Sequence, residues 1–177
     1  MERKLLGQVG VDSGQLVIID PCYIESEWQG KDSVLGVDFW GQGQEKIFSL
    51  LKDDGIQIER IGGKCRVITK DAEALIKRIK FLAEDMKQKI VTAPYTDSTY
   101  NKVCDITLTD DQGGQLNYKM GQPELGVAFN SGLGDGVYNV YATYKDVEGW
   151  GKRIVKVEIE LLDDEYLEDI NERFGMK

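Results

Sequence analysis

This chain has no imidazole to act as a general base, because its 177 residues include no histidine. Without imidazole, neither a Ser-His-Asp triad nor a Cys-His pair can form, and zinc sites built on histidine are excluded. Asp12, Asp20 and Asp135 lie beside predicted strands, and two carboxylates are sufficient for aspartic or glycosidic hydrolysis. Isolated aspartates of this kind more often make turns than bind Mg²⁺ or Ca²⁺, so we predict no metal or other cofactor.

The three cysteines, Cys22, Cys65 and Cys104, are single and widely spaced. No C-x-x-C pair occurs, which excludes a four-cysteine zinc site. Cys22 follows a predicted strand, but no histidine can lower the pKa of its thiol, so we expect a packed side chain and not a nucleophile. An odd number of cysteines, no secretory leader and no apolar run long enough to cross a bilayer predict a cytoplasmic protein that binds no membrane.

Ligand-binding residues are predicted at one hairpin tip and in the glycine-rich turns. In Glu148-Gly-Trp-Gly-Lys-Arg153, the Trp150 ring could stack on a base while the two cations hold a phosphate; the alternative is a tryptophan folded over the sheet edge. In Asn130-Ser-Gly-Leu-Gly-Asp135, the glycines either let backbone N–H groups approach a ligand or supply the positive φ angles of a tight hairpin. The predicted ligand-binding residues are Trp150, Lys152, Arg153, Asn130, Ser131, Asp135, Asp12 and Tyr23.

Charge is unevenly distributed along the chain. The net charge of −9 argues against general binding to nucleic acids, where neutralisation of phosphates supplies most of the affinity. Residues 60–90 nevertheless hold nine lysines or arginines against four acidic residues, so this segment carries +5 and the remainder −14. The segment is either a solvated helix face with intrahelical ion pairs or a patch for a small anionic ligand.

The elements that would position these residues follow from hydrophobic periodicity, which predicts the α+β class. We expect a mostly antiparallel sheet formed by N- and C-terminal strands, with a central helical excursion and a C-terminal helix. The chain is interpreted as a single domain over residues 1–177. Within it, residues 1–24 are predicted as an N-terminal hairpin, 25–95 as a loop and helical insertion, and 96–177 as a β-meander followed by the C-terminal helix.

Three segments carry the clearest periodicity. After Asp71 as the capping residue, apolar residues recur at helical spacing as far as Ile90. Residues 104–108 alternate between apolar and polar types, which predicts a strand. Val155 and Val157 alternate with charged residues, which predicts a strand with the valines facing the core.

Two segments resemble motifs of a family of uncharacterised bacterial and bacteriophage proteins. Val11-Asp-Ser-Gly-Gln-Leu-Val-Ile-Ile-Asp-Pro-Cys-Tyr23 is similar to an N-terminal "SGQ…DPCY" hairpin, and residues 129–144 are similar to a C-terminal "SG.GDGVY.VYA" hairpin. Together they cover 29 of the 177 residues, and residues 25–95 have no counterpart. The resemblance implies a bacterial or phage origin and a β-rich core, with no assigned activity.

Three functions are compatible with these features. The missing catalytic residues favour a non-enzymatic binding protein that captures a small anionic ligand; with a phage origin, it would serve counter-defence by sequestering a nucleotide immune signal of the host. A second hypothesis is a protein–protein inhibitor that masks a host enzyme with its acidic surface. The third is a carboxylate- or metal-dependent hydrolase. An open sheet edge is also compatible with a homodimer.

Overall fold

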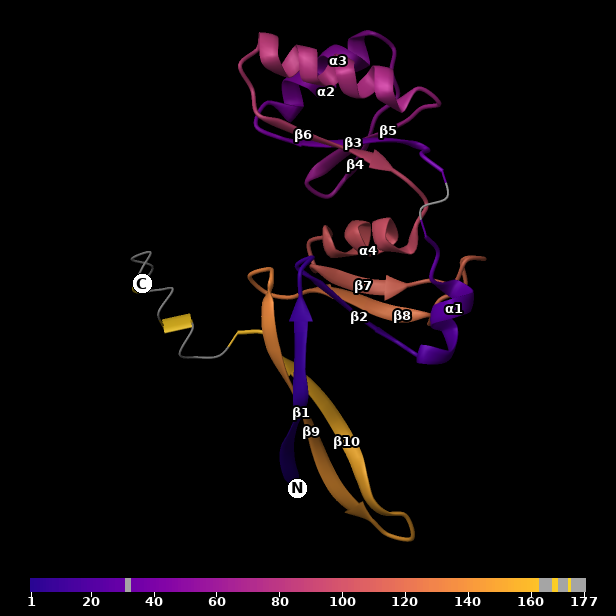
Figure 1. Cartoon of the computed structure of the whole chain (residues 1–177), viewed down its shortest axis with the longest axis vertical. Helices are drawn as coiled ribbons and strands as arrows, with labels where there is room; N and C mark the ends of the chain where they lie inside the picture. Colours follow the sequence, from indigo (N-terminus) through magenta and orange to yellow (C-terminus); the bar gives the residue numbers. More distant parts are fainter. Residues whose placement is uncertain (31–32, 163–166, 169–171, 173–177) are drawn as a thin grey trace. The chain divides into compact units, whose positions relative to one another are not determined.

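The computed structural model describes residues 1–30, 33–162, 167–168 and 172 (Figure 1). Its helices and antiparallel sheets confirm the α+β class. The chain divides into two compact units: unit 1 comprises Met1–Leu16 and Asn130–Lys177, and unit 2 comprises Val17–Phe129. These limits differ from the predicted ones at residues 24 and 95. The predicted C-terminal helix lies largely outside the described residues.

Unit 1 contains a three-stranded antiparallel sheet in the order β1-β9-β10 (Figure 1). Strands from the two ends of the sequence therefore share one sheet, as predicted. The prediction that Val155 and Val157 face a core is wrong, because both side chains are exposed. The tyrosines and β-branched residues of β9 favour an extended backbone. Gly149 and Gly151 have positive φ angles and close the hairpin that joins β9 to β10. The strands are β1 (Glu2–Val11), β9 (Gly136–Val147) and β10 (Gly151–Glu160).

The predicted N-terminal hairpin over residues 1–24 is wrong, because its two strands belong to different sheets. β1 pairs with β9, whereas β2 (Gln15–Ile19) joins the sheet β2-β8-β7, which also contains β7 (Gly113–Leu116) and β8 (Gly126–Asn130). A short turn between two extended segments is a hairpin signal only when the segments pair with each other. The choice of partner depends on strands more than a hundred residues away in sequence.

The rest of unit 2 is built around a four-stranded antiparallel sheet in the order β4-β5-β3-β6, with α2 and α3 packed on one face (Figure 1). Val37, Phe39, Ile47, Leu51 and Ile79 are buried between the helices and the sheet. Burial of this apolar area is the main stabilising term of the unit. The elements are β3 (Gly36–Gly41), α2 (Gln44–Asp53), β4 (Glu59–Ile61), β5 (Lys64–Ile68), α3 (Ala72–Asp85) and β6 (Ile90–Tyr95).

The interpretation of residues 25–95 as a loop and helical insertion missed β3 and β6. β3 is the clearest case, since its glycine content suggested a loop although it lies in the interior of the sheet. A Cβ atom at Gly36 would lie 2.1 Å from the carbonyl oxygen of Val67, so this position requires glycine for close approach of the strands. Two short helices, η1 (Pro21–Tyr23) and α1 (Ile24–Glu27), follow β2.

The helix predicted after Asp71 is confirmed as α3, and the Asp71 carboxylate accepts a hydrogen bond from the backbone N–H of Ala74. Leu75, Ile79 and Ala83 form its buried stripe. The helix ends at Asp85, so the predicted continuation to Ile90 is wrong. Lys87 has a φ angle of +53°, which ends the helix before the chain enters β6.

The strand predicted at residues 104–108 is wrong, because this segment belongs to the helix α4 (Thr99–Thr107). Thr99, Val103 and Thr107 are buried at a spacing of four residues, which is helical. The helix begins at Ser98, whose side-chain oxygen accepts a hydrogen bond from the N–H of Asn101. None of the described helices has the length and apolar composition needed to span a bilayer.

Replacement of Ser98 by alanine is expected to lower the free energy of unfolding by about 1 kcal/mol, because it removes the cap of α4. Urea unfolding followed by circular dichroism measures the change. Ser49→Ala is the matched control: Ser49 lies inside α2, where alanine is the better helix former. An equal loss of stability in both variants would contradict the capping role of Ser98.

Candidate ligand-binding site

The eight residues predicted to bind a ligand do not form one site. Trp150, Lys152 and Arg153 lie at the hairpin tip between β9 and β10, whereas residues 130–135 precede the other end of β9. β9 has 12 residues. At about 3.3 Å per residue it spans roughly 40 Å, so one small ligand cannot contact both groups. Tyr23 belongs to unit 2.

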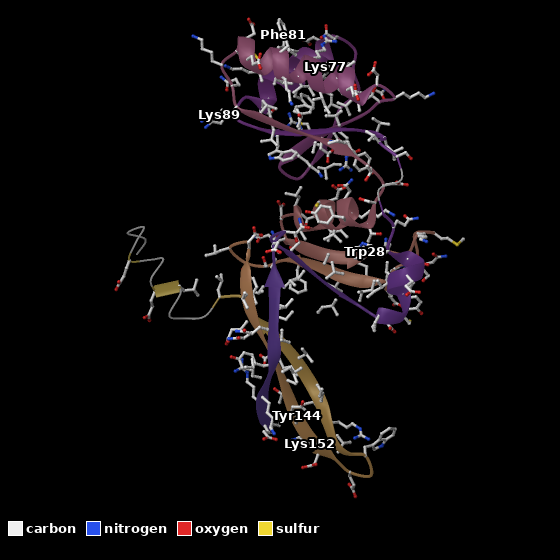
Figure 2. All side chains as sticks on the ribbon, in the orientation of Figure 1. Trp28, Lys77, Phe81, Lys89, Tyr144 and Lys152 are labelled. Atoms are coloured by element: carbon white, nitrogen blue, oxygen red, sulfur yellow. The ribbon has the colours of Figure 1, made fainter. Side chains whose placement is uncertain are left out.

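At the hairpin tip, the Trp150 ring is 69% exposed, so it is not folded over the sheet edge. The Lys152 ammonium lies 2.6 Å from Glu2 Oε2 and 4.7 Å from the centre of the Tyr144 ring (Figure 2). The hydrogen bond to Glu2 raises the pKa of Lys152. Arg153 Nη1 donates to the carbonyl oxygen of Lys152. Lys152 is thus held by a neighbouring carboxylate, an arrangement that weakens its attraction for phosphate.

The glycine-rich turn before β9 is held together by its own polar groups. Ser131 is fully buried, and its hydroxyl donates to the carbonyl oxygen of Gly134 at 2.5 Å. Asp135 Oδ1 accepts a hydrogen bond from the N–H of Gly14 at 2.9 Å. Gly132 and Gly134 have φ angles of +77° and +110°. The glycines therefore supply the positive φ angles of a tight turn, which was one of the two interpretations of this motif.

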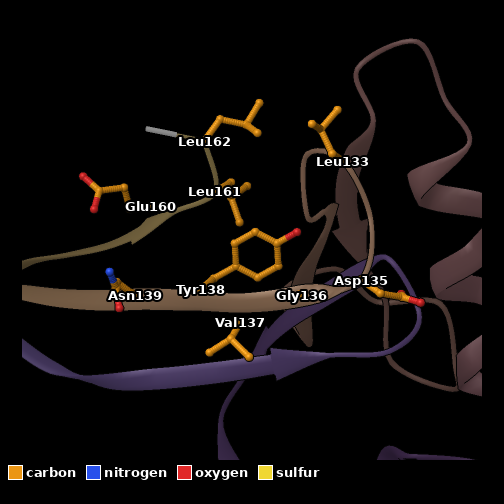
Figure 3. Close-up of a pocket in the computed structure, with 9 residues that line it drawn as sticks. All are labelled: Leu133, Asp135, Gly136, Val137, Tyr138, Asn139, Glu160, Leu161 and Leu162. Atoms are coloured by element: carbon orange, nitrogen blue, oxygen red, sulfur yellow. The ribbon is translucent and has the colours of Figure 1, made fainter. Parts of the chain in front are cut away.

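Next to this turn, unit 1 has a cavity of about 290 Å³ (Figure 3). Figure 3 shows the Tyr138 ring beside Leu161, and the Tyr138 hydroxyl donates to Gly134 O at 2.7 Å. Asp135 and Glu160 also line the cavity. Two carboxylates in the wall repel an anion, so the cavity closest to the predicted residue Asp135 does not suit the predicted anionic ligand.

The three aspartates considered for hydrolysis are divided between the two units. Asp12 and Asp135 belong to unit 1 and Asp20 to unit 2. Asp20 caps the short helix η1, and the hydrogen bond from the backbone N–H of Cys22 lowers the pKa of its carboxyl. Among the residues that the structure describes, no group of three potential ligands could hold a metal ion. Asp20 thus caps η1, and Asp135 accepts a hydrogen bond from the backbone N–H of Gly14.

Cys22 is exposed, which corrects the prediction of a packed side chain. It lies in the helix η1, which follows β2 at the surface. The Asp20 carboxylate raises the pKa of its thiol through a hydrogen bond. A raised pKa decreases the thiolate fraction at neutral pH, so Cys22 has none of the activation that a nucleophile needs.

The positive charge of the basic segment 60–90 is partly neutralised by carboxylates from outside it. Lys64 and Arg66 of β5 are buried and form a cluster, here called the charge cluster, with Asp38 of β3 and Asp105 of α4. Two exposed arginines of the segment also have carboxylate partners: Arg60 pairs with Glu45 and Arg78 with Asp54. The patch predicted over this segment is therefore reduced, because four of its nine cations are paired.

Each of the two cations in the charge cluster binds both carboxylates. Arg66 binds Asp38 through Nε at 2.7 Å and through Nη2 at 2.8 Å. It binds Asp105 through Nη1 at 2.7 Å and Nη2 at 2.9 Å. The Lys64 ammonium lies 2.7 Å from Asp38 and 2.8 Å from Asp105. Arg66 also lies over the Tyr95 ring at 3.5 Å from its centre. Such complete pairing is what makes buried charge tolerable.

The pKa of Asp38 reflects two opposing effects. Burial raises the pKa of this carboxyl, but the hydrogen bonds from Arg66 and Lys64 outweigh burial and hold the pKa below its ordinary value. The pKa of Lys64 is raised, because bonds to Asp105 and Asp38 outweigh its own desolvation. Asp38 and Lys64 are therefore both ionised at neutral pH.

Beside the charge cluster, unit 2 has an open cavity of about 400 Å³, here called the α4–β7 cavity. Lys102, Asp105 and Ile106 of α4 form one wall, and residues 115–119 form another. Lys102 Nζ donates to Gln29 Oε1 at 3.5 Å. Lys119 Nζ donates to the carbonyl oxygen of Ser26, and its backbone N–H donates to Glu27 Oε2 at 3.1 Å. Two ammonium groups with neutral acceptors thus line this cavity.

Tyr118 supplies an aromatic wall of the α4–β7 cavity. Its ring meets the Tyr23 ring edge to face, with centres 5.3 Å apart. The hydrogen bond with Tyr23 raises the pKa of Tyr118, so its hydroxyl stays protonated at neutral pH. Tyr23, which was predicted to bind a ligand together with residues of unit 1, therefore contacts a wall of the α4–β7 cavity instead.

Lys102, Tyr118 and Lys119 are not among the residues predicted to bind a ligand. Because residues 104–108 were assigned to a strand, the helical neighbours Lys102, Asp105 and Ile106 were not recognised as one surface. Serine is favoured at helix N-caps, so Ser98 was the signal that could have identified α4. Nothing in the local sequence of Lys119 indicated that it would lie opposite this helix.

The comparisons with known proteins identify no relative: no family model, no curated protein and no solved structure matches the chain. The resemblance of its two hairpin motifs to a bacterial and phage family stays a prediction.

Proposed function

We propose that this chain is a non-enzymatic binding protein that captures a small anionic ligand, such as a nucleotide, in the α4–β7 cavity. One observation carries the proposal. Lys102 and Lys119 line the cavity, while the carboxylate in its wall, Asp105, is already neutralised by Lys64 and Arg66. The cavity thus attracts anions within a chain whose net charge is −9.

The size and chemistry of the walls favour a ligand with both charged and planar parts. About 400 Å³ lies in the range of small-molecule sites. The two ammonium groups suit phosphate oxygens, and the side-chain amide of Asn117 offers a further polar contact at the wall. The Tyr118 ring provides a surface on which a base can stack.

Capture without turnover is favoured over hydrolysis. Both oxygens of Asp105 accept hydrogen bonds from Arg66, so this carboxylate is not available as a general base. Among the residues that the structure describes, neither histidine nor cysteine lines the cavity. We therefore expect the ligand to be recovered intact after binding. With a phage origin, such capture would serve counter-defence by removing a nucleotide signal of the host.

The first test is a thermal-shift screen with ATP, ADP, cyclic dinucleotides and ADP-ribose, each with and without Mg²⁺. A ligand at about a hundredfold excess over Kd stabilises the native state by about 2.7 kcal/mol, which raises Tm by a few degrees. For the strongest binder, Lys102→Gln and Lys119→Gln are each expected to raise Kd by about 10- to 100-fold, because each removes a charged hydrogen-bond donor.

Lys77→Gln is the matched control for these variants. Lys77 is exposed on α3, and the substitution removes the same charge away from the α4–β7 cavity (Figure 2). Titration calorimetry should give an unchanged Kd for this variant. If all three substitutions raised Kd equally, the effect would arise from net charge. That result would contradict binding in the α4–β7 cavity. Conversion of the nucleotide to product would contradict capture and favour the hydrolase hypothesis.

A further inference from the structure

One short segment of unit 2 is bonded to both lysines of the α4–β7 cavity. Residues 20–29, here called the strap, follow β2 and contain η1 and α1 (Figure 1). The carbonyl oxygen of Ser26 accepts a hydrogen bond from Lys119 Nζ. Gln29 Oε1 accepts one from Lys102 Nζ at 3.5 Å. Both ammonium groups proposed to bind the ligand therefore have strap oxygens as partners.

The two acceptors lie close together along the chain. Ser26 and Gln29 are three residues apart, so their Cα atoms are at most about 11 Å apart even if this stretch is fully extended. Lys102 and Lys119 therefore meet at one short stretch of the strap. The two neutral oxygens take the hydrogen bonds that the oxygens of one anionic ligand would otherwise accept.

Thr99, at the start of α4, holds the C-terminal end of the strap. Its hydroxyl accepts a hydrogen bond from the N–H of Gln29 at 2.8 Å and donates to the carbonyl oxygen of Glu27 at 3.4 Å. The N–H of Thr99 donates to the carbonyl oxygen of Gln29 at 3.1 Å. On the other side, Glu27 Oε2 accepts a hydrogen bond from the N–H of Lys119 at 3.1 Å. Polar contacts thus attach the strap to both walls of the α4–β7 cavity.

Burial contributes little to holding the strap in place. No residue of η1 or α1 is buried, and Ile24 is 46% exposed and Trp28 39% exposed (Figure 2). Each of these helices is a single turn, which is too short to be stable by itself. Segments with few buried apolar groups open locally without unfolding of the whole protein. The strap can therefore leave the two lysines while the fold of unit 2 persists.

We propose that the strap is an autoinhibitory element of the α4–β7 cavity, which an anionic ligand displaces from Lys102 and Lys119. The inference rests on the proposed function and adds how binding is regulated. A phosphate oxygen is a stronger partner for an ammonium group than a neutral oxygen, because attraction between opposite charges adds to the hydrogen bond. The strap must open before the ligand binds. The measured Kd is therefore the intrinsic Kd divided by the fraction of chains with an open strap.

Thr99→Val tests whether the strap competes with the ligand. Valine has the branched shape of threonine but lacks the hydroxyl that bonds Gln29 and Glu27, so more chains have an open strap. Titration calorimetry on the full chain with ATP, ADP, cyclic dinucleotides and ADP-ribose gives the Kd of the tightest binder. Thr99→Val is expected to lower this Kd about 3- to 10-fold. A purely structural role of Thr99 would raise the Kd or leave it unchanged, and either result overturns the proposal.

Thr99→Ser is the matched control, because serine keeps the hydroxyl and should leave the Kd as in the wild type. An equal decrease in both variants would overturn the role of the hydroxyl. If circular dichroism shows that Thr99→Val is unfolded, Gln29→Ala replaces it, since it removes the acceptor of Lys102 and should also lower the Kd. Its control is Gln57→Ala, because Gln57 lines a different cavity.

Hydrogen exchange with the same nucleotides separates failure of the strap from failure of the proposed function. When the tightest binder is added, the amides of residues 20–29 are expected to exchange at least about threefold faster, because the strap is released. Binding with unchanged or slower exchange in the strap would overturn this inference and leave the proposed function intact. Binding to Thr99→Val alone would support the strap. If no nucleotide binds either the wild type or this variant, both proposals are overturned.

Discussion

Replacing Asp38 by alanine is expected to lower the free energy of unfolding by about 3–5 kcal/mol, one of the two largest effects expected from a single change. Asp38 is buried and binds both Lys64 and Arg66. Without its carboxylate, two cations remain buried with Asp105 as their carboxylate partner. Breaking a buried ion pair on one side leaves an uncompensated charge, which costs far more than the pair contributes. Urea unfolding followed by circular dichroism measures the loss.

Asp54→Ala is the matched control, because Asp54 pairs with Arg78 at the surface. An exposed pair contributes no more than about 1 kcal/mol, so this variant should unfold close to the wild type. A second readout is pH. The pKa of Asp38 is lowered in the folded state, so its contribution to stability is complete above the unfolded pKa and is lost as the pH falls below about 4.

Asp38→Asn should therefore lose less stability between neutral and acid pH than the wild type does. The asparagine has no proton to gain, so the part of the acid destabilisation that arises at this position disappears. Parallel stability curves for the wild type and Asp38→Asn over this range would contradict the assignment of a lowered pKa to Asp38. Such curves would mean that the loss of stability at acid pH arises from other carboxyl groups.

The second large effect is expected at Phe39, in the core of the four-stranded sheet of unit 2. Phe39→Ala should lower the free energy of unfolding by about 3–5 kcal/mol, because Phe39 is fully buried and its removal leaves a cavity. Thermal and urea unfolding both measure this loss. Phe81→Ala is the control: Phe81 is 68% exposed on α3, so its truncation should change stability by no more than about 0.5 kcal/mol (Figure 2).

A similar loss in both phenylalanine variants would mean that α3 buries Phe81 against a partner, since the single chain leaves it exposed. A small loss at Phe39 would contradict the core described for β3. Both variants remove a phenylalanine side chain. A difference between their losses of stability therefore arises from burial and not from the chemistry of phenylalanine.

The charge cluster connects the fold to the proposed site. Asp38 and Arg66 belong to the four-stranded sheet, whereas Asp105 belongs to α4. The hydrogen bonds from Arg66 to Asp105 thus hold α4 to the sheet. Lys102 lies three residues before Asp105, on the same side of the helix. We expect the cluster to position this lysine at the α4–β7 cavity, which is a role beyond stability.

The sequence by itself determined the elements whose signals are local. The helix α3 was predicted because its apolar residues recur at helical spacing and Asp71 can cap it, and both features act within a few residues of the chain. β10 was predicted because its alternating side chains match the strand period. The absence of histidine determined which kinds of catalysis are excluded, since composition alone decides that question.

Only the tertiary structure determined which strands pair and which charged side chains lie together. β1 pairs with β9 and β2 with β8, because strand partners are selected by packing across long stretches of sequence and not by the turn between neighbours. Asp38 and Asp105 pair with two cations of the basic segment, Lys64 and Arg66; the two aspartates lie outside it in sequence but within hydrogen-bond distance in space. Because Coulomb energy and burial depend on distance and solvent in three dimensions, neither the neutralised cluster nor the two lysines of the α4–β7 cavity could be recognised from residue order.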